Sequence, residues 1–200
     1  MNIEIKKLTP ELADDYLHFF KDVAFSDHKD WAGCCCLHFH WDDQLAADHK
    51  EFCKTARKGD CSFSWRYAEK YVMNGTIQGY LAYSDGQVVG WCNANDKKNY
   101  AVLKANVKPE LWTDDAESKV KSVVCFTIAP DMRGKGIATQ LLQRVCDDAK
   151  EQGCELVEAY PAVDSDDVFV NHHGPAALYL KHGFAIYKQS GNQAIMRKYL

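Results

Sequence analysis

The sequence predicts an α/β fold, in which a mixed central sheet is flanked by helices within a single domain. A run of β-favouring residues at 123–128 leads through Pro130 into a glycine-rich turn and a long helical pattern. Residues 80–92 read as a hairpin around the turn Ser84-Asp85-Gly86-Gln87. Strand and helix patterns then alternate from 119 to 188, which is typical of an α/β sheet.

Bulk composition narrows the classes of protein. The 200 residues, 46% of them hydrophobic, suffice for one well-packed domain but not comfortably for two. A net charge of −4 and a pI near 6.0 argue against a nucleic-acid partner. The absence of a run of about 18 apolar residues argues against a membrane partner. The N-terminal alternation of apolar and polar residues is a strand pattern rather than a secretion signal.

The nine cysteines are an odd number and include the adjacent Cys34-Cys35-Cys36. This arrangement does not resemble a secreted disulfide framework. Several others lie in apolar periodic segments, where a free thiol behaves as a small hydrophobe. We therefore expect a reduced, cytoplasmic protein.

The first half of the chain predicts one strand and three helices. The strand covers 3–8, and Thr9-Pro10 opens a helix that extends to Val23. A second amphipathic helix begins at Asp42-Asp43 and ends near Gly59. Its expected buried face consists of Leu45, Ala46, His49, Phe52, Cys53 and Ala56. A third helix covers 62–73.

The second half predicts the remaining strands. The hairpin strands cover 80–83 and 88–92, and the polar stretch 93–118 reads as an extended loop with a short strand or turn of its own. Further elements are a strand over 119–128, a helix over 134–152, a strand over 154–160, a short helix over 175–182 and a final strand pair over 184–188 and 194–199. The expected order is β-α-α-α-β-β-β-α-β-α-β-β.

The glycine-rich turn predicts a phosphate site. Gly134 and Gly136 let the backbone approach a ligand closely, and the N–H groups that open the following helix favour an anion. The Walker loop needs Ser or Thr after Gly-Lys, whereas Gly136 follows Lys135 here. The dinucleotide fingerprint needs a third spaced glycine.

Arg133-Gly134-Lys135-Gly136-Ile137-Ala138 resembles motif A of the GNAT superfamily of acyl-CoA-dependent N-acyltransferases. The stretch 174–184 resembles motif B, in which a helix carrying Tyr179 is followed four residues later by Gly183-Phe184. The resemblance is strong over about 119–188 and weak over 25–78. It implies a GNAT-type domain over 1–200, acetyl-CoA as co-substrate and no metal.

The resemblance also implies roles for residues. Those that would hold the CoA diphosphate are Arg133, Gly134, Lys135, Gly136, Ile137, Ala138 and Thr139. Phe126, Thr127 and Ile128 would pair with the pantetheine arm, and a backbone N–H there would meet the oxyanion. Tyr179 would protonate the departing thiolate, although a core tyrosine is the alternative. The asparagine often found seven residues before this tyrosine is His172 here, beside Asn171.

An attacking amine must lose a proton, directly or through water. Glu158 is the first candidate base, since strand alternation places it on one face with Leu156 and Tyr160 near the expected cleft. A solvated strand glutamate is the equally weighted alternative.

Asp164, Asp166 and Asp167 lie in the loop that edges the acceptor site in this fold. Three acids there would favour a cationic substrate by electrostatic focusing, although a solvated acidic loop is the alternative.

Residues 31–41, rich in Trp, Cys and His, invite a zinc site. Ligands alternating along one strand would span about 20 Å and would not converge on one ion, so we expect no zinc site. We expect this segment to form a wall of the acceptor pocket, because the resemblance places it in the region that varies most between members of the fold. A reactive cysteine nucleophile is a further alternative.

The sequence as a whole predicts an N-acetyltransferase that moves an acetyl group to the primary amine of a small cationic molecule by direct attack. Acetylation of a protein lysine or N-terminus is the alternative enzyme activity, and a catalytically silent CoA-binding sensor is the alternative from another class. The resemblance allows a monomer or a homodimer.

Overall fold

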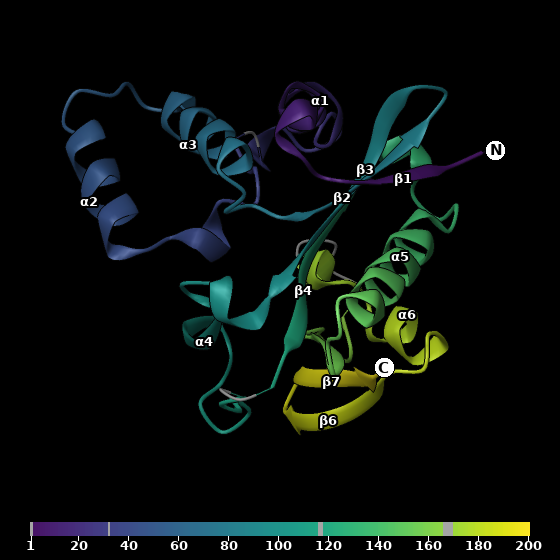
Figure 1. The fold of residues 1–200 in the computed structure, drawn as a ribbon. Coiled ribbons are helices and arrows are strands. Elements are labelled where there is room, and N and C mark those ends of the chain that lie inside the picture. The colour runs from purple at the N-terminus through teal and green to yellow at the C-terminus, as the bar shows by residue number, and fades with distance from the viewer. Residues whose placement is uncertain (1, 32, 116–117, 166–169) are drawn as a thin grey trace.

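The computed structural model describes residues 2–31, 33–115, 118–165 and 170–200. Its centre is a seven-stranded sheet with the order β1-β2-β3-β4-β5-β7-β6 (Figure 1). The strands are β1 (Glu4–Lys7), β2 (Gly79–Ser84), β3 (Gln87–Asp96), β4 (Val120–Ile128), β5 (Leu156–Ala159), β6 (Ala185–Ser190) and β7 (Gln193–Tyr199). Strands β4 and β5 pair in parallel, and the other neighbours pair antiparallel.

Helices cover both faces of the sheet (Figure 1). The α-helices are α1 (Ala13–His18), α2 (Asp43–Phe52), α3 (Ser62–Met73), α4 (Leu103–Asn106), α5 (Ile137–Glu151) and α6 (Ala176–Lys181). Helix α5 packs on strands β2 to β5 from one side, whereas α1 and the π-helical turn η2 (Phe19–Val23) that continues it pack on the other side beside α3. The mixed α/β fold expected from the sequence is confirmed.

Trp91 on β3 is fully buried and anchors the core under α1 and η2. Its ring lies 4.9 Å from the Tyr16 ring and 6.4 Å from the Phe20 ring. On the other face, the neighbouring Gly90 lies under α5, where an added Cβ would stand 3.0 Å from Ile137 Cγ2. A side chain at Gly90 would therefore push α5 away from the sheet.

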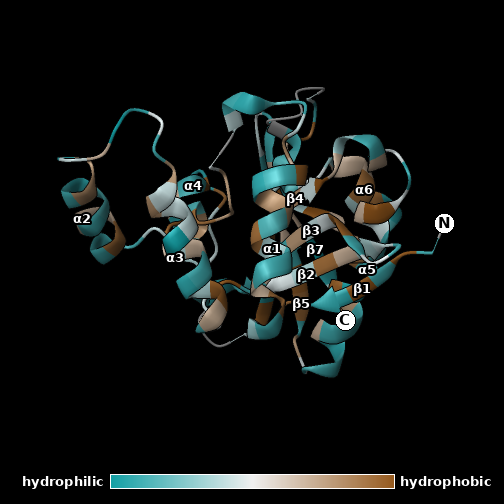
Figure 2. Ribbon diagram, turned by 90° about the horizontal axis from the view of Figure 1, so that it is seen from above, coloured by the Kyte–Doolittle hydropathy of each residue, from teal (hydrophilic) through white to brown (hydrophobic). Residues whose placement is uncertain are grey.

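The prediction for the second helix was wrong in its end, which lies at Phe52 rather than near Gly59, and in its buried face. Helix α2 has an apolar stripe, yet Leu45 is its one buried residue, because the helix lies beside α3 at the margin of the molecule (Figures 1 and 2). Residues 33–41 form no strand. They turn, with Cys36 at φ 53°, and enter the short 3₁₀ turn η4 (His38–His40).

The stretch 93–118 is also more structured than the sequence suggested. Strand β3 continues to Asp96, and the 3₁₀ turn η5 (Lys97–Asn99) and helix α4 follow it. No helix within the described ranges combines the length and apolarity that crossing a bilayer demands.

Candidate active site

The turn between β4 and α5 has the backbone of an anion-binding loop. After the 3₁₀ turn η6 (Pro130–Met132), Gly134 and Gly136 take φ values of 73° and 78°. Gly136 is the N-cap of α5. No heavy atom lies within 4 Å of a Cβ added at either glycine, so these positions face open space rather than packed protein. The left-handed backbone, not crowding, therefore requires glycine there.

The N–H groups that follow are free of backbone partners. The first bond of α5 runs from Gln140 N to Gly136 O, and among the described residues no backbone bond is donated by the N–H groups of 134–139. A row of unsatisfied amides at a helix start binds anions through their partial positive charge. The assignment of residues 133–139 to a diphosphate stays a prediction, and the loop offers the amides that it requires.

The Arg133 side chain forms contacts within the protein, whereas the backbone amides that follow it have no backbone partner among the described residues. Its Nη1 lies 2.5 Å from Asp27 Oδ2, and its Nε donates to Ile128 O at 3.2 Å. The guanidinium thus ties the loop to the segment after η2, and its hydrogen bond lowers the pKa of Asp27. Lys135 Nζ contacts Met132 Sδ at 3.6 Å.

Upstream of the loop, β4 separates from β5. The two strands pair from Val120–Leu156 to Val123–Ala159, and β4 then continues alone on that side to Ile128. A bulge at Val124 marks the point of separation, because Asn93 pairs with Cys125 while Ala94 pairs with Val123. The edge of β4 that holds Phe126, Thr127 and Ile128 is therefore not covered by β5.

Tyr179 on α6 lies against this opening. Its ring is fully buried, with the Phe126 ring at 6.4 Å and the Phe184 ring at 5.2 Å. Its hydroxyl donates to His173 O in the 3₁₀ turn η7 (Val170–His173). Burial raises the pKa of the phenol well above its ordinary value, so Tyr179 holds its proton at neutral pH.

Glu158 is not the solvated strand glutamate that the sequence left open, because it is fully buried. Its carboxylate lies 2.6 Å from Arg197 Nη2 and 2.8 Å from Lys97 Nζ. Asp115 completes the group, at 2.7 Å from Lys97 and 2.8 Å from Arg197. We call Glu158, Asp115, Lys97 and Arg197 the buried ion cluster; its two acids and two bases balance in charge.

A short chain of hydroxyl groups links Glu158 to β4. Tyr160 Oη donates to Glu158 Oε1 at 2.8 Å, and Ser122 Oγ lies 2.8 Å from Tyr160 Oη. Ser122 pairs in register with Glu158 just before the strands separate. Ser122, Lys97, Asp115 and Arg197 were not anticipated, and Lys97 and Asp115 lie in the stretch read as a polar loop.

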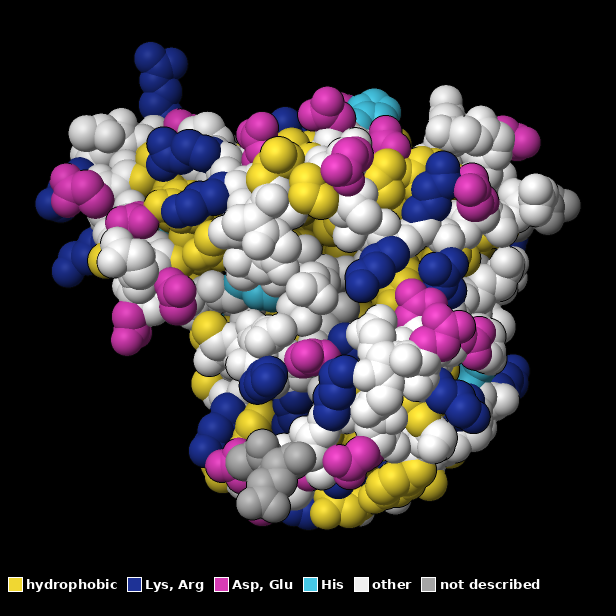
Figure 3. Space-filling view, in the orientation of Figure 1, with side chains coloured by type: hydrophobic (Ala, Val, Ile, Leu, Met, Phe, Trp, Pro, Cys, Tyr) yellow, Lys and Arg dark blue, Asp and Glu magenta, His cyan; other side chains and the backbone are white. Residues whose placement is uncertain are grey.

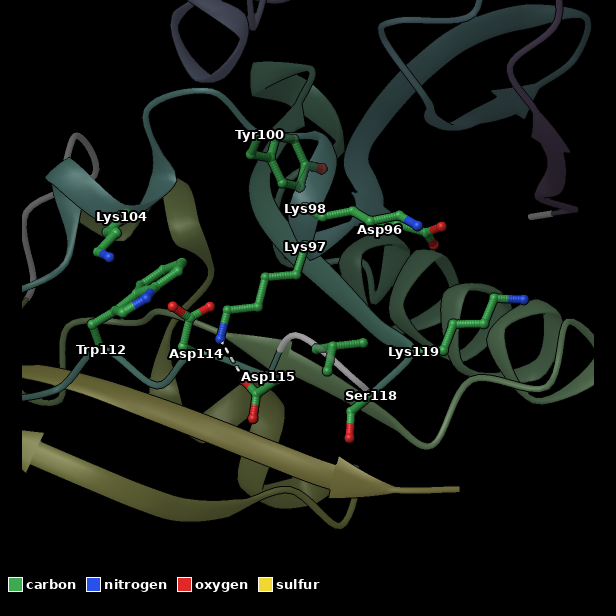
Figure 4. A pocket seen from close by; sticks show the side chains of 11 residues that line it. Asp96, Lys97, Lys98, Tyr100, Lys104, Trp112, Asp114, Asp115, Ser118 and Lys119 are labelled. Atoms are coloured by element: carbon green, nitrogen blue, oxygen red, sulfur yellow. Dashed lines mark hydrogen bonds and ion pairs between the residues drawn. The ribbon is translucent and has the colours of Figure 1, made fainter.

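A separate cavity of about 470 Å³ lies at the opposite end of β4 from the anion-binding loop (Figure 4). Lys97, Lys104, Trp112 and Asp115 are among the residues that line it. Because it adjoins the start of β4 at Val120, it is distinct from the loop that follows Ile128.

The other predicted segments are only partly placed. Asp164 is exposed, and its N–H donates to Asn192 Oδ1 at 2.7 Å. Asp166 and Asp167 lie outside the described residues. His172 occupies the position of the asparagine that is common in the family. The neighbouring Asn171 donates a hydrogen bond from Nδ2 to Ser165 O at 2.6 Å.

In the segment 33–41, Cys36 and His40 are buried whereas Cys34 and His38 are exposed. The described part of the chain holds no group of three or more His, Cys, Asp or Glu side chains placed to bind a metal. Burial raises the pKa of the Cys35 thiol well above its ordinary value, which does not suit a thiolate nucleophile.

The strand edge that β5 leaves uncovered and the free amides at the start of α5 together suit an extended ligand that carries a diphosphate. Residues 49–184 match the model of the Acetyltransferase (GNAT) family. This match covers more than half of the sequence, and the chain belongs to this family of acetyltransferases, which use acetyl-CoA. A search of curated proteins found no match.

Solved structures share the fold. A PaiA N-acetyltransferase from Thermoplasma acidophilum in complex with coenzyme A is 16% identical, covers 100% of both chains and has a TM-score of 0.53. A GNAT-family acetyltransferase from Listeria monocytogenes is 12% identical over 99% of this chain and 95% of its own, with a TM-score of 0.56. A ribosomal-protein-alanine N-acetyltransferase from Brucella melitensis is 15% identical over 98% and 99%, with a TM-score of 0.51.

Proposed function

We propose that the protein transfers an acetyl group from acetyl-CoA to the primary amine of a small molecule by direct attack. The supporting observation is the row of unpaired amides at 134–139, which follows directly on the strand edge that β5 leaves uncovered. Residues 133–139 hold the diphosphate, and Phe126, Thr127 and Ile128 flank the pantetheine arm. Acetyl-CoA supplies an activated acyl carbon to the attacking amine.

Tyr179 acts as the proton donor in this proposal. Its phenol is buried and protonated, and it stands against the opened strand edge through Phe126. The Tyr179 hydroxyl donates its proton to a hydrogen bond with His173 O. That bond must break for Tyr179 to protonate a departing thiolate.

Glu158 acts as base through Tyr160 rather than by touching the amine. Its carboxylate is held by Arg197 and Lys97, and the Tyr160 hydroxyl is the contact that leads from it to Ser122 beside the opening. Tyr160 would pass its own proton to Glu158 as it accepts one from the substrate side, which leaves the phenol unchanged.

The acceptor was expected to be a small cation selected by the acidic loop. Asp164 is the described member of that loop, and its exposure is compatible with long-range attraction. We further infer a single domain over 1–200, a cytoplasmic location and a monomeric or homodimeric protein without nucleic-acid or membrane partners.

The test is acetyl-CoA turnover with a panel of amines, read as release of free CoA and as product mass. Saturable turnover with small amines supports the proposal. Acetylation confined to polypeptide lysines or N-termini would show a protein acetyltransferase, and tight CoA binding without turnover of any amine would show a sensor.

A further inference from the structure

Two buried polar side chains near the opening of the sheet have polar atoms without partners. His40 is 3% exposed and Asn93 is 0% exposed. Within the described residues, no hydrogen bond reaches either ring nitrogen of His40 or the Asn93 Nδ2. Cys36 is a neighbour of the Asn93 side chain, and their interaction lowers the pKa of the thiol; because sulfur is a weak acceptor, it is a poor partner for the amide. The same lack of a partner holds for the enclosed Nδ1 of His173.

These groups form one cluster although they come from distant parts of the chain. The His40 ring lies 5.4 Å from the Tyr100 ring, and Tyr100 Oη donates to Asn93 Oδ1 at 2.8 Å. Phe39 bridges the other side, with its ring 6.0 Å from Tyr100 and 5.8 Å from His173. We call His40, Asn93, Tyr100 and His173 the His40 cluster.

The His40 cluster adjoins the point where β4 leaves β5. Asn93 pairs in register with Cys125, next to the bulge at Val124. The His173 ring forms a hydrogen bond with the backbone of Val124. The backbone carbonyl of His173 accepts a hydrogen bond from the Tyr179 hydroxyl. The cluster is therefore in contact with both the opened strand edge and the proposed proton donor.

Unpaired buried polar atoms are costly, at roughly 1–3 kcal/mol each. Folded proteins leave few of them, so these atoms require a partner, which an ordered water or a bound ligand supplies. The surface is hollowed between the part that carries α2 and α3 and the part that carries α4 (Figure 3).

The chemistry of the cluster selects its ligand. A neutral imidazole offers one donor and one acceptor, and the Asn93 amide nitrogen offers donors. The cavity that Tyr100 helps to line also holds the carboxylates of Asp96, Asp114 and Asp115, but its four lysines outnumber them, and Glu158 is already paired with Arg197 and Lys97. A second positive charge on the acceptor would find no counter-ion among the side chains of the His40 cluster.

We propose that His40 and Asn93 bind the part of the acceptor beyond its reacting amine, and that this part is a neutral amide or hydroxyl group rather than a second cation. This inference rests on the proposed acetyl transfer and specifies the substrate class of the same site. It replaces the polycationic acceptor that the acidic loop suggested.

The experiment compares three amines with the same five-atom chain: β-alaninamide, 3-amino-1-propanol and 1,3-diaminopropane. Binding to the CoA-loaded protein is measured by calorimetry, and acetylation is measured separately. We expect β-alaninamide or 3-amino-1-propanol to bind and react at least tenfold better than the diamine. Preference for the first identifies an amide, and preference for the second identifies a hydroxyl group.

Variants at position 40 test whether His40 causes the preference for a neutral amine. His40→Phe should raise the Kd and KM of the preferred neutral amine roughly tenfold, the loss of one to two hydrogen bonds, and leave the diamine unchanged. His40→Gln, which keeps a donor and an acceptor, should restore much of the affinity. His38→Phe, on the exposed side of the same turn, is the matched control. Because His40 has no partner to lose, His40→Phe should melt no lower than the wild type at neutral pH.

The outcomes separate the two proposals. Selective binding of a neutral amine without acetylation would overturn the proposed function and leave the His40 assignment standing. Acetylation in which the diamine equals or exceeds the neutral amines would overturn the assignment and leave the function standing. Failure of both neutral amines to bind, or an equal effect of His40→Phe on all three, would also overturn the assignment.

Discussion

At the scale of single residues, burial determines the protonation state of each titratable group in the site. Burial lowers the pKa of His40 from 6.5 to about 4, and desolvation lowers that of His173 to about 3. The same effect raises the pKa of Tyr179 well above 10.0. Two neutral imidazoles and one protonated phenol therefore surround the opening at neutral pH.

These histidines should make the protein sensitive to mild acid. Above pH 6.5 His40 is neutral in both the folded and the unfolded chain. As the pH falls below 6.5, His40 becomes protonated in the unfolded chain but stays neutral in the folded protein until about pH 4. The free energy of unfolding therefore decreases over this range. His40 alone should account for a loss of roughly 2 kcal/mol between pH 7 and pH 5, at about 1.4 kcal/mol per pKa unit.

Urea unfolding at pH 7 and pH 5 measures this loss. His40→Phe should lose clearly less stability over that interval than the wild type, whereas His38→Phe should follow the wild type. An unchanged pH dependence in a folded His40→Phe protein would contradict the buried, neutral state of His40.

Tyr179→Phe should keep the affinity for CoA and lower kcat, because only the proton donor is removed. General acid catalysis contributes typically ~10²–10⁴-fold. Calorimetry with CoA and steady-state turnover measure the two quantities, and Tyr199→Phe, on a side chain that is 69% exposed, is the control. Turnover at the wild-type rate would assign Tyr179 to the core alone.

At the scale of elements, the junction between β4 and α5 is the part of the site that local sequence specifies. We expect Gly136→Val to weaken CoA binding at least tenfold, because valine disfavours the left-handed backbone that aims the amides. Gly86→Val, in the β2–β3 turn with a similar φ of 79° and open surroundings, is the matched control for strain. Calorimetry showing equal CoA affinity in a folded Gly136→Val protein would defeat the assignment.

The pairing of β5 with β7 sets Glu158 opposite Arg197, and the segment between β3 and β4 adds Lys97 and Asp115 to the buried ion cluster. Glu158→Gln leaves the charges of Lys97 and Arg197 without one buried carboxylate, and we expect about 3–5 kcal/mol of lost stability. Glu155→Gln, at an exposed position before the same strand, should cost much less. Chemical unfolding measures both.

A separate variant tests the catalytic part of this proposal. Tyr160→Phe keeps all four charges and removes the hydroxyl between Glu158 and Ser122. It should lower kcat and change its pH profile. If kcat and its pH profile are unchanged, the cluster is structural and another group accepts the amine proton.

At the scale of the whole molecule, contacts distant in sequence tune the loop. Asp27 reaches Arg133 across 106 positions and places a negative charge beside the anion site. Asp27→Asn should tighten CoA binding two- to fivefold at low salt and less at high salt, where screening is stronger. Stability should change little, since solvent-accessible ion pairs contribute about 0–1 kcal/mol.

Asp30→Asn removes the same charge from the exposed turn nearby and is the control for net charge. Calorimetric titration with CoA at two ionic strengths distinguishes the variants. Weaker binding in Asp27→Asn would mean that Asp27 positions Arg133 for the ligand instead of competing with it.

The sequence by itself determined the fold class, the hairpin, the glycine turn and the helix that follows it. These features depend on neighbours within a few residues: strand propensity before Pro130, left-handed glycines at 134 and 136, and apolar periodicity in α5. The position of Tyr179 relative to Gly183-Phe184 is likewise local. Each could be read because its physical cause lies within one short stretch.

Only the tertiary structure decided the environment of the reacting groups. Glu158 reads as an ordinary strand glutamate until strand pairing brings Arg197 against it and the turn after β3 brings Lys97. His40 reads as one more histidine in an aromatic segment until the rings of Tyr71 and Tyr100 lie against it. Desolvation and ion pairing depend on partners tens of residues away, and no local pattern of residues encodes which distant side chain will exclude the water.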